Sequence, residues 1–223
     1  MVKQDITDTE KTVSRSSKVV ITRPKFESAI FYIKGNAPLV VHRFSVKTRN
    51  ELKQKMLEGK SAGSKKNREP KDPEEIYNAG RYISSNGGWD GFNAAGLRKA
   101  MISACKLVDF KMTLAKCSIF VVQDGWDAKE PQIPLVRILD CESIMQEDIA
   151  KTSTGEPYVC FRPAYHGWGA KVHIRWDNDQ FKLVDIGNLL VRVGIQVGLC
   201  EGRPDSKKGP GMGWGTFDVV ESA

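Results

Sequence analysis

The sequence lacks the features that mark several common classes of protein. Its 223 residues contain no apolar run near the ~18–20 residues that a membrane-spanning helix needs, which excludes that class. Residues 1–18 are polar and carry charges of both signs, without the apolar stretch of a secretory signal, so we expect a cytoplasmic protein. The five cysteines are widely spaced, odd in number and without a Cys-x-x-Cys pair. This predicts reduced thiols, and neither a disulfide framework nor a zinc site.

Catalytic motifs are also lacking. No HExxH, GxSxG or Walker motif occurs, and the glycine-rich stretch follows a helical pattern instead of preceding one, unlike a dinucleotide-binding turn. The three histidines, His42, His166 and His173, have neither metal-ligand nor catalytic-triad spacing. We therefore expect no metal, no cofactor and no enzymatic activity. One catalytic alternative stays open, in which His42 is the general acid of a metal-independent ribonuclease.

What the chain does have is positive charge and enough apolar residues for a core. Lys and Arg number 34 against 27 Asp and Glu, a net charge of +7, and 40% of the residues are hydrophobic. The length fits one domain, and the excess of basic over acidic residues favours a polyanionic partner. Residues 43–71, which we call the basic excursion, hold ten Lys or Arg against three Glu. We interpret them as a short helix at 47–57 followed by a mobile loop.

Hydrophobic periodicity predicts the order of elements. The expected strands are 26–34, read as buried, 114–122, 171–176 and 216–220, and the expected helices are 93–108 and 184–197. Without its insertions this order is β-α-β-β-α-β, which predicts an α+β, ferredoxin-like or RRM-like antiparallel sheet. We expect a flexible tail at 1–24 and a domain at 25–223, with insertions at about 43–92 and 131–169, the second a hairpin.

Two basic features favour nucleic acid. Residues 198–215, which we call the glycine segment, hold six glycines together with Arg203, Lys207 and Lys208. Glycines let backbone N–H groups converge on a phosphate, although a floppy surface loop fits equally well. In strand 171–176 the basic residues alternate with apolar ones, which indicates one cationic face or simply a half-exposed strand.

Aromatic residues supply candidates for base stacking. Most tryptophans in proteins lie in cores. Of the five in this chain, Trp168, which ends the second insertion, is the best stacking candidate, and Tyr165 beside it is another.

Two local motifs carry a family resemblance. Residues 93–100 (Asn-Ala-Ala-Gly-Leu-Arg-Lys-Ala) form the first, and residues 198–204, running on to 211–215, form the second. The first is similar to the Pro-x-Ser-Ser-Leu-Lys-Gly helix start of the RAMP superfamily, with alanines for the serines and Lys99 for the glycine. The second resembles the glycine-rich loop before the closing strand in the backbone subunits of CRISPR effector complexes. The chain also resembles solitary RAMP-like proteins of phages and mobile elements, which we favour.

The resemblance implies a palm that holds single-stranded nucleic acid, in a bacterial or phage-infected cell. Residues 131–169 would be a thumb, residues 43–92 would line the groove, and copies would stack head-to-tail along the strand as a homo-oligomer. Target-cleaving relatives use an aspartate in the loop after the first strand. Residues 35–50 contain no Asp or Glu, which argues against cleavage.

We therefore expect a non-catalytic, sequence-tolerant binder of single-stranded RNA or DNA. Its contacts are predicted at Arg43, Lys47, Lys65, Lys66, Arg68, Arg98, Lys99, Tyr165, Trp168, Arg203, Lys207 and Lys208. Two alternatives stay open: the ribonuclease with His42, and an assembly protein whose basic loops are merely solvated. The choice between RNA and DNA depends on 2′-hydroxyl contacts that the sequence does not reveal.

Overall fold

The computed structural model describes residues 23–44, 46–57, 72–151, 155–206 and 211–221. Over these residues the protein is an α+β fold with three antiparallel sheets. Residues 1–22 of the expected tail and the middle of the basic excursion lie outside the described residues. None of the described helices is long and apolar enough to cross a bilayer.

The central sheet joins strands from both ends of the domain. It contains β1 (Phe26–Gly35), β5 (Ile119–Val122), β10 (Gly169–Asp177) and β11 (Phe217–Val220), hydrogen-bonded in the order β11-β1-β10-β5 with every pair antiparallel. The period-two pattern of β10 buries Val172, Ile174 and Trp176 and leaves Lys171 and Arg175 exposed. The strands predicted at 26–34, 171–176 and 216–220 are confirmed.

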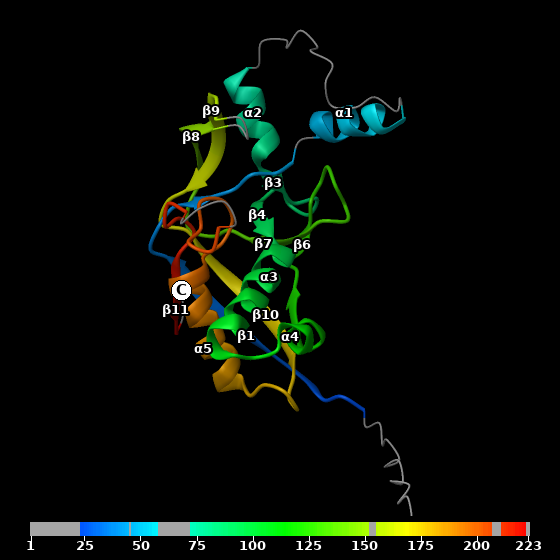
Figure 1. The fold of residues 1–223 in the computed structure, drawn as a ribbon, viewed down its shortest axis with the longest axis vertical. Coiled ribbons are helices and arrows are strands. Elements are labelled where there is room, and N and C mark those ends of the chain that lie inside the picture. Colours follow the sequence, from blue (N-terminus) through cyan, green and yellow to red (C-terminus); the bar gives the residue numbers. More distant parts are fainter. Residues whose placement is uncertain (1–22, 45, 58–71, 152–154, 207–210, 222–223) are drawn as a thin grey trace, which may run out of the picture.

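Two helices, α3 (Ala94–Ala104) and α5 (Leu183–Arg192), cover one face of this sheet, and Figure 1 looks onto them with β1 and β10 behind. The Asn93 side chain accepts a hydrogen bond from the Ala95 N–H at 2.9 Å and so caps α3. Leu97 and Leu190 are fully buried beneath the two helices. Both predicted helices are confirmed; α3 ends in a 3-10 turn (Cys105–Val108) and α5 in a π turn (Val193–Val197).

The strand predicted at 114–122 begins too early. Helix α4 (Met112–Ser118) occupies its first half, and the strand is confined to β5. The Ser118 hydroxyl donates to the Leu114 carbonyl at 2.9 Å, one turn back, and Ala115 is buried. A short apolar run fits a strand and a buried helix equally well, so periodicity alone could not place this boundary.

A second sheet lies beside the end of the central sheet that is uppermost in Figure 1. It contains β3 (Tyr82–Ile83), β4 (Asp90–Asn93), β6 (Gly125–Trp126) and β7 (Pro134–Arg137), in the order β3-β4-β7-β6. Just beyond β7, Leu139 and Gly169 exchange backbone hydrogen bonds of 2.8 and 3.0 Å. Because Gly169 begins β10, these bonds fix the second sheet to the central sheet.

The third sheet carries the predicted hairpin. Strands β8 (Ser143–Lys151) and β9 (Pro157–Tyr165) form it, and β2 (Leu39–Val40) pairs with β9. Helix α2 (Pro73–Gly80) packs against β9, and α1 (Val46–Leu57) lies at the same end of the molecule (Figure 1). The hairpin within 131–169 and the helix at 47–57 are thus confirmed, although β7 places residues 134–137 in the second sheet.

Candidate nucleic-acid interface

The face of the central sheet that points away from α3 and α5 carries exposed and half-buried side chains from three neighbouring strands. We call it the open sheet face, and it consists of Phe26, Ser28, Ile30, Tyr32, Phe120, Val122, Lys171, His173 and Arg175. The register sets these residues in rows, with Arg175 opposite Ser28 on one side and Phe120 on the other. Ile30 is 59% exposed and Phe26 41%.

Contacts between cations and aromatic rings organise this face. The guanidinium carbon of Arg175 lies 5.3 Å from the ring centroid of Phe26 and 5.4 Å from that of Phe120. The ammonium nitrogen of Lys171 lies 5.2 Å from the ring centroid of Tyr32. Among the described residues neither Lys171 nor Arg175 has a salt-bridge partner. The face therefore combines flat apolar surface with two cations that form no salt bridge to a described carboxylate.

At the Tyr32 end, the open sheet face runs into a shallow pocket of about 310 Å³, which we call the Trp89 pocket. It is lined by Trp89, Asp124, Arg137, Leu139 and Lys171. Lys171 belongs to both surfaces, so the two are continuous. The guanidinium carbon of Arg137 lies 5.9 Å from the Trp89 ring, which repeats the pairing of a cation with an aromatic ring.

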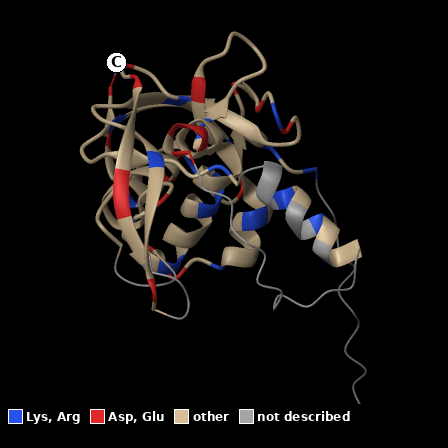
Figure 2. Ribbon diagram, turned by 90° about the horizontal axis from the view of Figure 1, so that it is seen from above, with Lys and Arg blue, Asp and Glu red and all other residues tan. Residues whose placement is uncertain are grey.

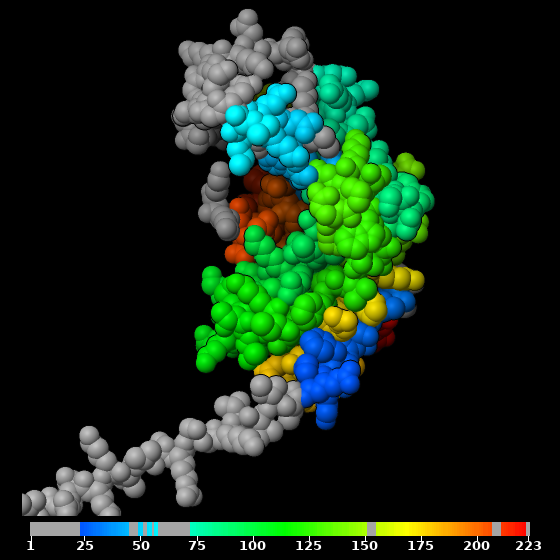
Figure 3. Space-filling view, turned by 90° about the vertical axis from the view of Figure 1, so that its right-hand side faces the viewer, coloured from blue at the N-terminus to red at the C-terminus, as the bar shows by residue number. Residues whose placement is uncertain are grey.

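A second concave surface gathers segments that the sequence predicts to bind nucleic acid. Figure 3 shows a hollow between α1 above and the green helices α3 and α4 below, with orange residues of the C-terminal region in its depth. The Ser103 hydroxyl of α3 donates to the Asp205 carboxylate of the glycine segment at 2.6 Å. Lys99, one helical turn before Ser103, is exposed on that side of α3. Helix α1, above the hollow, carries Lys and Arg (Figure 2); of these, Lys53 is exposed, whereas Arg49 pairs with Glu130.

Six of the predicted contacts cannot be placed. The residues Lys65, Lys66, Arg68, Lys207 and Lys208 and the side chain of Lys47 lie outside the described part of the chain. The hollow therefore stays a candidate whose described cations are few.

Arg43, predicted to hold a phosphate, is instead 2% exposed, and this prediction is wrong. Its Nε donates to the Asp127 carboxylate at 3.0 Å, and its Nη2 donates to Glu130 at 3.1 Å. Arg49 of α1 also pairs with Glu130. The guanidinium thus neutralises two buried carboxylates of the β6–β7 connection and is not available to a ligand.

The two predicted stacking residues are also core residues. Trp168 is fully buried, its indole N–H donates to the Ala37 carbonyl at 2.9 Å, and its ring packs edge-on against Phe92 and Phe217. Tyr165 is likewise fully buried, and this burial raises the pKa of its hydroxyl. Since neither ring reaches the surface, neither can stack on a base, and both predictions are wrong.

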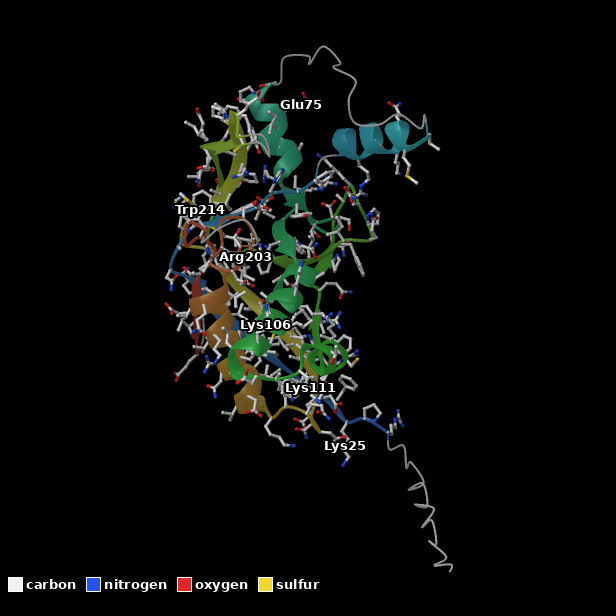
Figure 4. The ribbon with its side chains drawn as sticks, in the orientation of Figure 1. Lys25, Glu75, Lys106, Lys111, Arg203 and Trp214 are labelled. Atoms are coloured by element: carbon white, nitrogen blue, oxygen red, sulfur yellow. The ribbon has the colours of Figure 1, made fainter. Side chains whose placement is uncertain are left out.

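Arg98 and Arg203 are half-buried, and the guanidinium groups of both donate hydrogen bonds to backbone carbonyls of the protein. Arg98 donates to the carbonyls of Lys116 and Ile119 and so ties α3 to the end of α4. Arg203 donates to the Cys200 carbonyl at 2.8 Å within the glycine segment (Figure 4). These bonds occupy part of each guanidinium, so Lys99 is the predicted cation that the structure leaves exposed on α3.

The described part of the glycine segment is closely packed. A Cβ at Gly215 would lie 2.0 Å from the Leu199 carbonyl oxygen, and one at Gly211 would lie 2.1 Å from that of Arg203. The Met212 N–H donates to the Gly202 carbonyl, and the Gly215 N–H donates to that of Pro38. These glycines permit close approach of the chain to itself, and the N–H groups serve internal turns in place of a phosphate cradle.

His42, the general acid of the ribonuclease alternative, is exposed at the surface. Partial desolvation of its ring lowers the pKa of the imidazole, Glu201 raises it, and Arg162 lowers it. A lowered pKa reduces the protonated fraction, which disfavours the acid role. In the described part of the chain, no group of three or more His, Cys, Asp or Glu side chains could hold a metal ion.

Sequence reasoning missed the aromatic part of the open sheet face. Strand 26–34 was expected to be buried, but Phe26, Ile30 and Tyr32 alternate with the core residues Phe31 and Ile33 and point outward. The signal in the sequence was that apolar residues occupy both the odd and the even positions of this strand. Such a pattern usually indicates a strand that is buried on both faces of its sheet. No known family model and no curated protein matches the chain.

Proposed function

We propose that this protein binds single-stranded nucleic acid along the open sheet face. The observation that carries the proposal is a cluster in which Arg175 lies over the rings of Phe26 and Phe120, which also contact each other edge-on. Lys171, on the same strand as Arg175, lies over Tyr32 of β1. Bases stack on exposed aromatic rings at about 1–3 kcal/mol each, and cations beside them pair with the phosphates. A duplex hides the faces of its bases, so such a surface favours a single strand.

The order of the central strands supports the same proposal. The sequence β11-β1-β10-β5, all antiparallel with α3 and α5 on one face, is the arrangement expected of a ferredoxin-like or RRM-like domain. RRM domains bind RNA on the exposed face of such a sheet through stacked aromatic residues. We retain as part of the proposal a RAMP-like, non-catalytic protein that assembles head-to-tail along the strand.

A pair of charge-matched variants tests the site. Lys171→Gln with Arg175→Gln removes two positive charges from the open sheet face, and Lys99→Gln with Lys106→Gln removes two from the helical side (Figure 4 labels Lys106). We expect the first variant to weaken binding of labelled RNA and DNA oligomers by at least about tenfold, measured by fluorescence anisotropy. The second should bind within about twofold of the parent.

If the Lys99 and Lys106 variant lost more affinity than the Lys171 and Arg175 variant, the nucleic acid would bind in the hollow of Figure 3, and the proposed site would be wrong. If the parent protein binds neither RNA nor DNA, the function itself is wrong and the assembly alternative stands. Loss of intact labelled RNA in EDTA, abolished by His42→Ala, would restore the ribonuclease alternative.

A further inference from the structure

We propose that the Trp89 pocket holds one guanine base of the bound strand, an inference that rests on the proposed function. The stacking surface is the indole of Trp89, whose six-membered ring lies against two glycines. A Cβ at Gly91 would stand 3.0 Å from its Cζ3, and one at Gly125 would stand 2.9 Å from its Cζ2. Glycine at both positions leaves room for the ring on the second sheet, where it forms one wall of the pocket.

Asp124 supplies the group that distinguishes bases. Its Oδ2 accepts the backbone N–H of Arg137 at 2.8 Å, which orients the exposed carboxylate in the pocket wall. An ionised carboxylate only accepts hydrogen bonds, and both oxygens have further lone pairs. Guanine presents two adjacent donors, N1–H and the N2 amino group, that match these two oxygens. Adenine and cytosine offer one amino group beside a ring acceptor, and uracil offers one N–H between two carbonyls.

The remaining walls suit the rest of the nucleotide. Arg137 and Lys171 are exposed, and neither has a salt-bridge partner among the described residues. Arg137 lies over the indole, 5.9 Å from its centroid, so a stacked base requires this exposed side chain to move aside, where its guanidinium can pair with a phosphate or with the O6 and N7 acceptors of guanine. A volume of about 310 Å³ is at the small end of ligand pockets, which fits one nucleotide and not an extended segment.

The shared lysine connects this pocket to the proposed strand path. Lys171 lies over Tyr32 on the open sheet face and also lines the pocket. A nucleic-acid strand whose bases stack on the open sheet face would therefore place one further base against the indole of Trp89. The protein would read one guanine while tolerating any base elsewhere.

The test compares labelled oligouridylates that differ only at one central position, which is A, C, G or U. We expect the guanine oligomer to bind the parent protein about tenfold more tightly than the other three, as a bidentate base contact provides. Asp124→Asn should remove this preference, measured as the ratio of affinities for the guanine oligomer and plain oligouridylate, because the asparagine amide offers one acceptor oxygen where the carboxylate offers two. Asp218→Asn, which removes an exposed carboxylate from β11, is the matched charge control and should keep the preference.

The outcomes separate the pocket from the function. If no oligomer binds, the proposed function fails. If all four bind equally, if another base is preferred, or if Asp124→Asn keeps the guanine preference, the function stands and the pocket assignment is wrong. A second measurement follows tryptophan fluorescence on addition of GMP or AMP, with Trp89→Phe as reference. Quenching by GMP that Trp89→Phe abolishes supports the pocket and shows that the free nucleotide suffices, whereas equal quenching by AMP contradicts guanine selection.

Discussion

At the scale of single residues, the clearest distinction is between charges that hold the fold and charges that face solvent. Arg43, Asp127 and Glu130 are almost wholly buried and form ion pairs of 3.0 and 3.1 Å, although Asp127 Oδ1 has no hydrogen-bond partner among the described residues. Lys34 and Asp140 form a pair of 2.8 Å whose side chains are 45% and 44% exposed. Water screens the second pair, so the two should differ greatly in their effect on stability.

Replacement of Arg43 by methionine should lower the free energy of unfolding by about 3–5 kcal/mol, because it leaves the Asp127 carboxylate buried without a cation and Glu130 paired with Arg49 alone. Urea unfolding followed by circular dichroism measures this loss. The control is Lys34→Met, which should cost no more than about 1 kcal/mol. Similar losses in the two variants would contradict the structural role assigned to Arg43.

At the scale of elements, the glycine segment shows how a flexible sequence becomes a fixed turn. Gly213 and Gly215 have positive φ values of 76° and 67°, a conformation that costs other residues about 1–2 kcal/mol. They differ in their surroundings, since a Cβ at Gly213 would meet nothing within 4 Å, whereas one at Gly215 would collide with the Leu199 carbonyl oxygen.

Gly213→Ala should therefore cost about 1–2 kcal/mol, which is the backbone penalty alone. Gly215→Ala should cost about 1–3 kcal/mol more, because the packed chain must also move apart. Thermal unfolding of both variants gives the comparison. If Gly215→Ala is no worse than Gly213→Ala, this part of the segment is not closely packed in solution.

Elements with strong periodicity could be predicted and sites made by several elements could not. The alternation in β10 and the stripes of α3 and α5 fix which side is buried, so these elements match their predictions. Trp168 and Arg43 gave no comparable signal, because their partners Phe92 and Asp127 are far away along the chain. The Trp89 pocket likewise depends on the pairing of β4, β6 and β7, which periodicity does not specify.

At the scale of the whole molecule, net charge and local contacts make different contributions to binding. The chain carries +7 overall, but the open sheet face and the Trp89 pocket together present Lys171, Arg175 and Arg137. The salt dependence of binding counts the phosphates that are contacted, whatever the total charge.

For three contacts to a single strand, log affinity should fall with log salt concentration at a slope of about −2. Replacing both Lys171 and Arg175 by glutamine should reduce the slope to about −0.7. Anisotropy titrations over a series of potassium chloride concentrations provide both values. A parent slope near −4, unchanged in the variant, would indicate that the cations of the hollow carry the binding instead.

The paired backbone hydrogen bonds between Leu139 and Gly169 have a consequence for avidity. They join the second sheet, which bears Trp89, to the start of β10, which bears Lys171. A strand that touches both sheets is thus a bivalent ligand whose two attachment points are held by rigid backbone and not by a linker. Once the nucleic acid is bound at one sheet, its binding at the other sheet is intramolecular. The effective concentration of the second site is then higher than a flexible linker between the two sites would give.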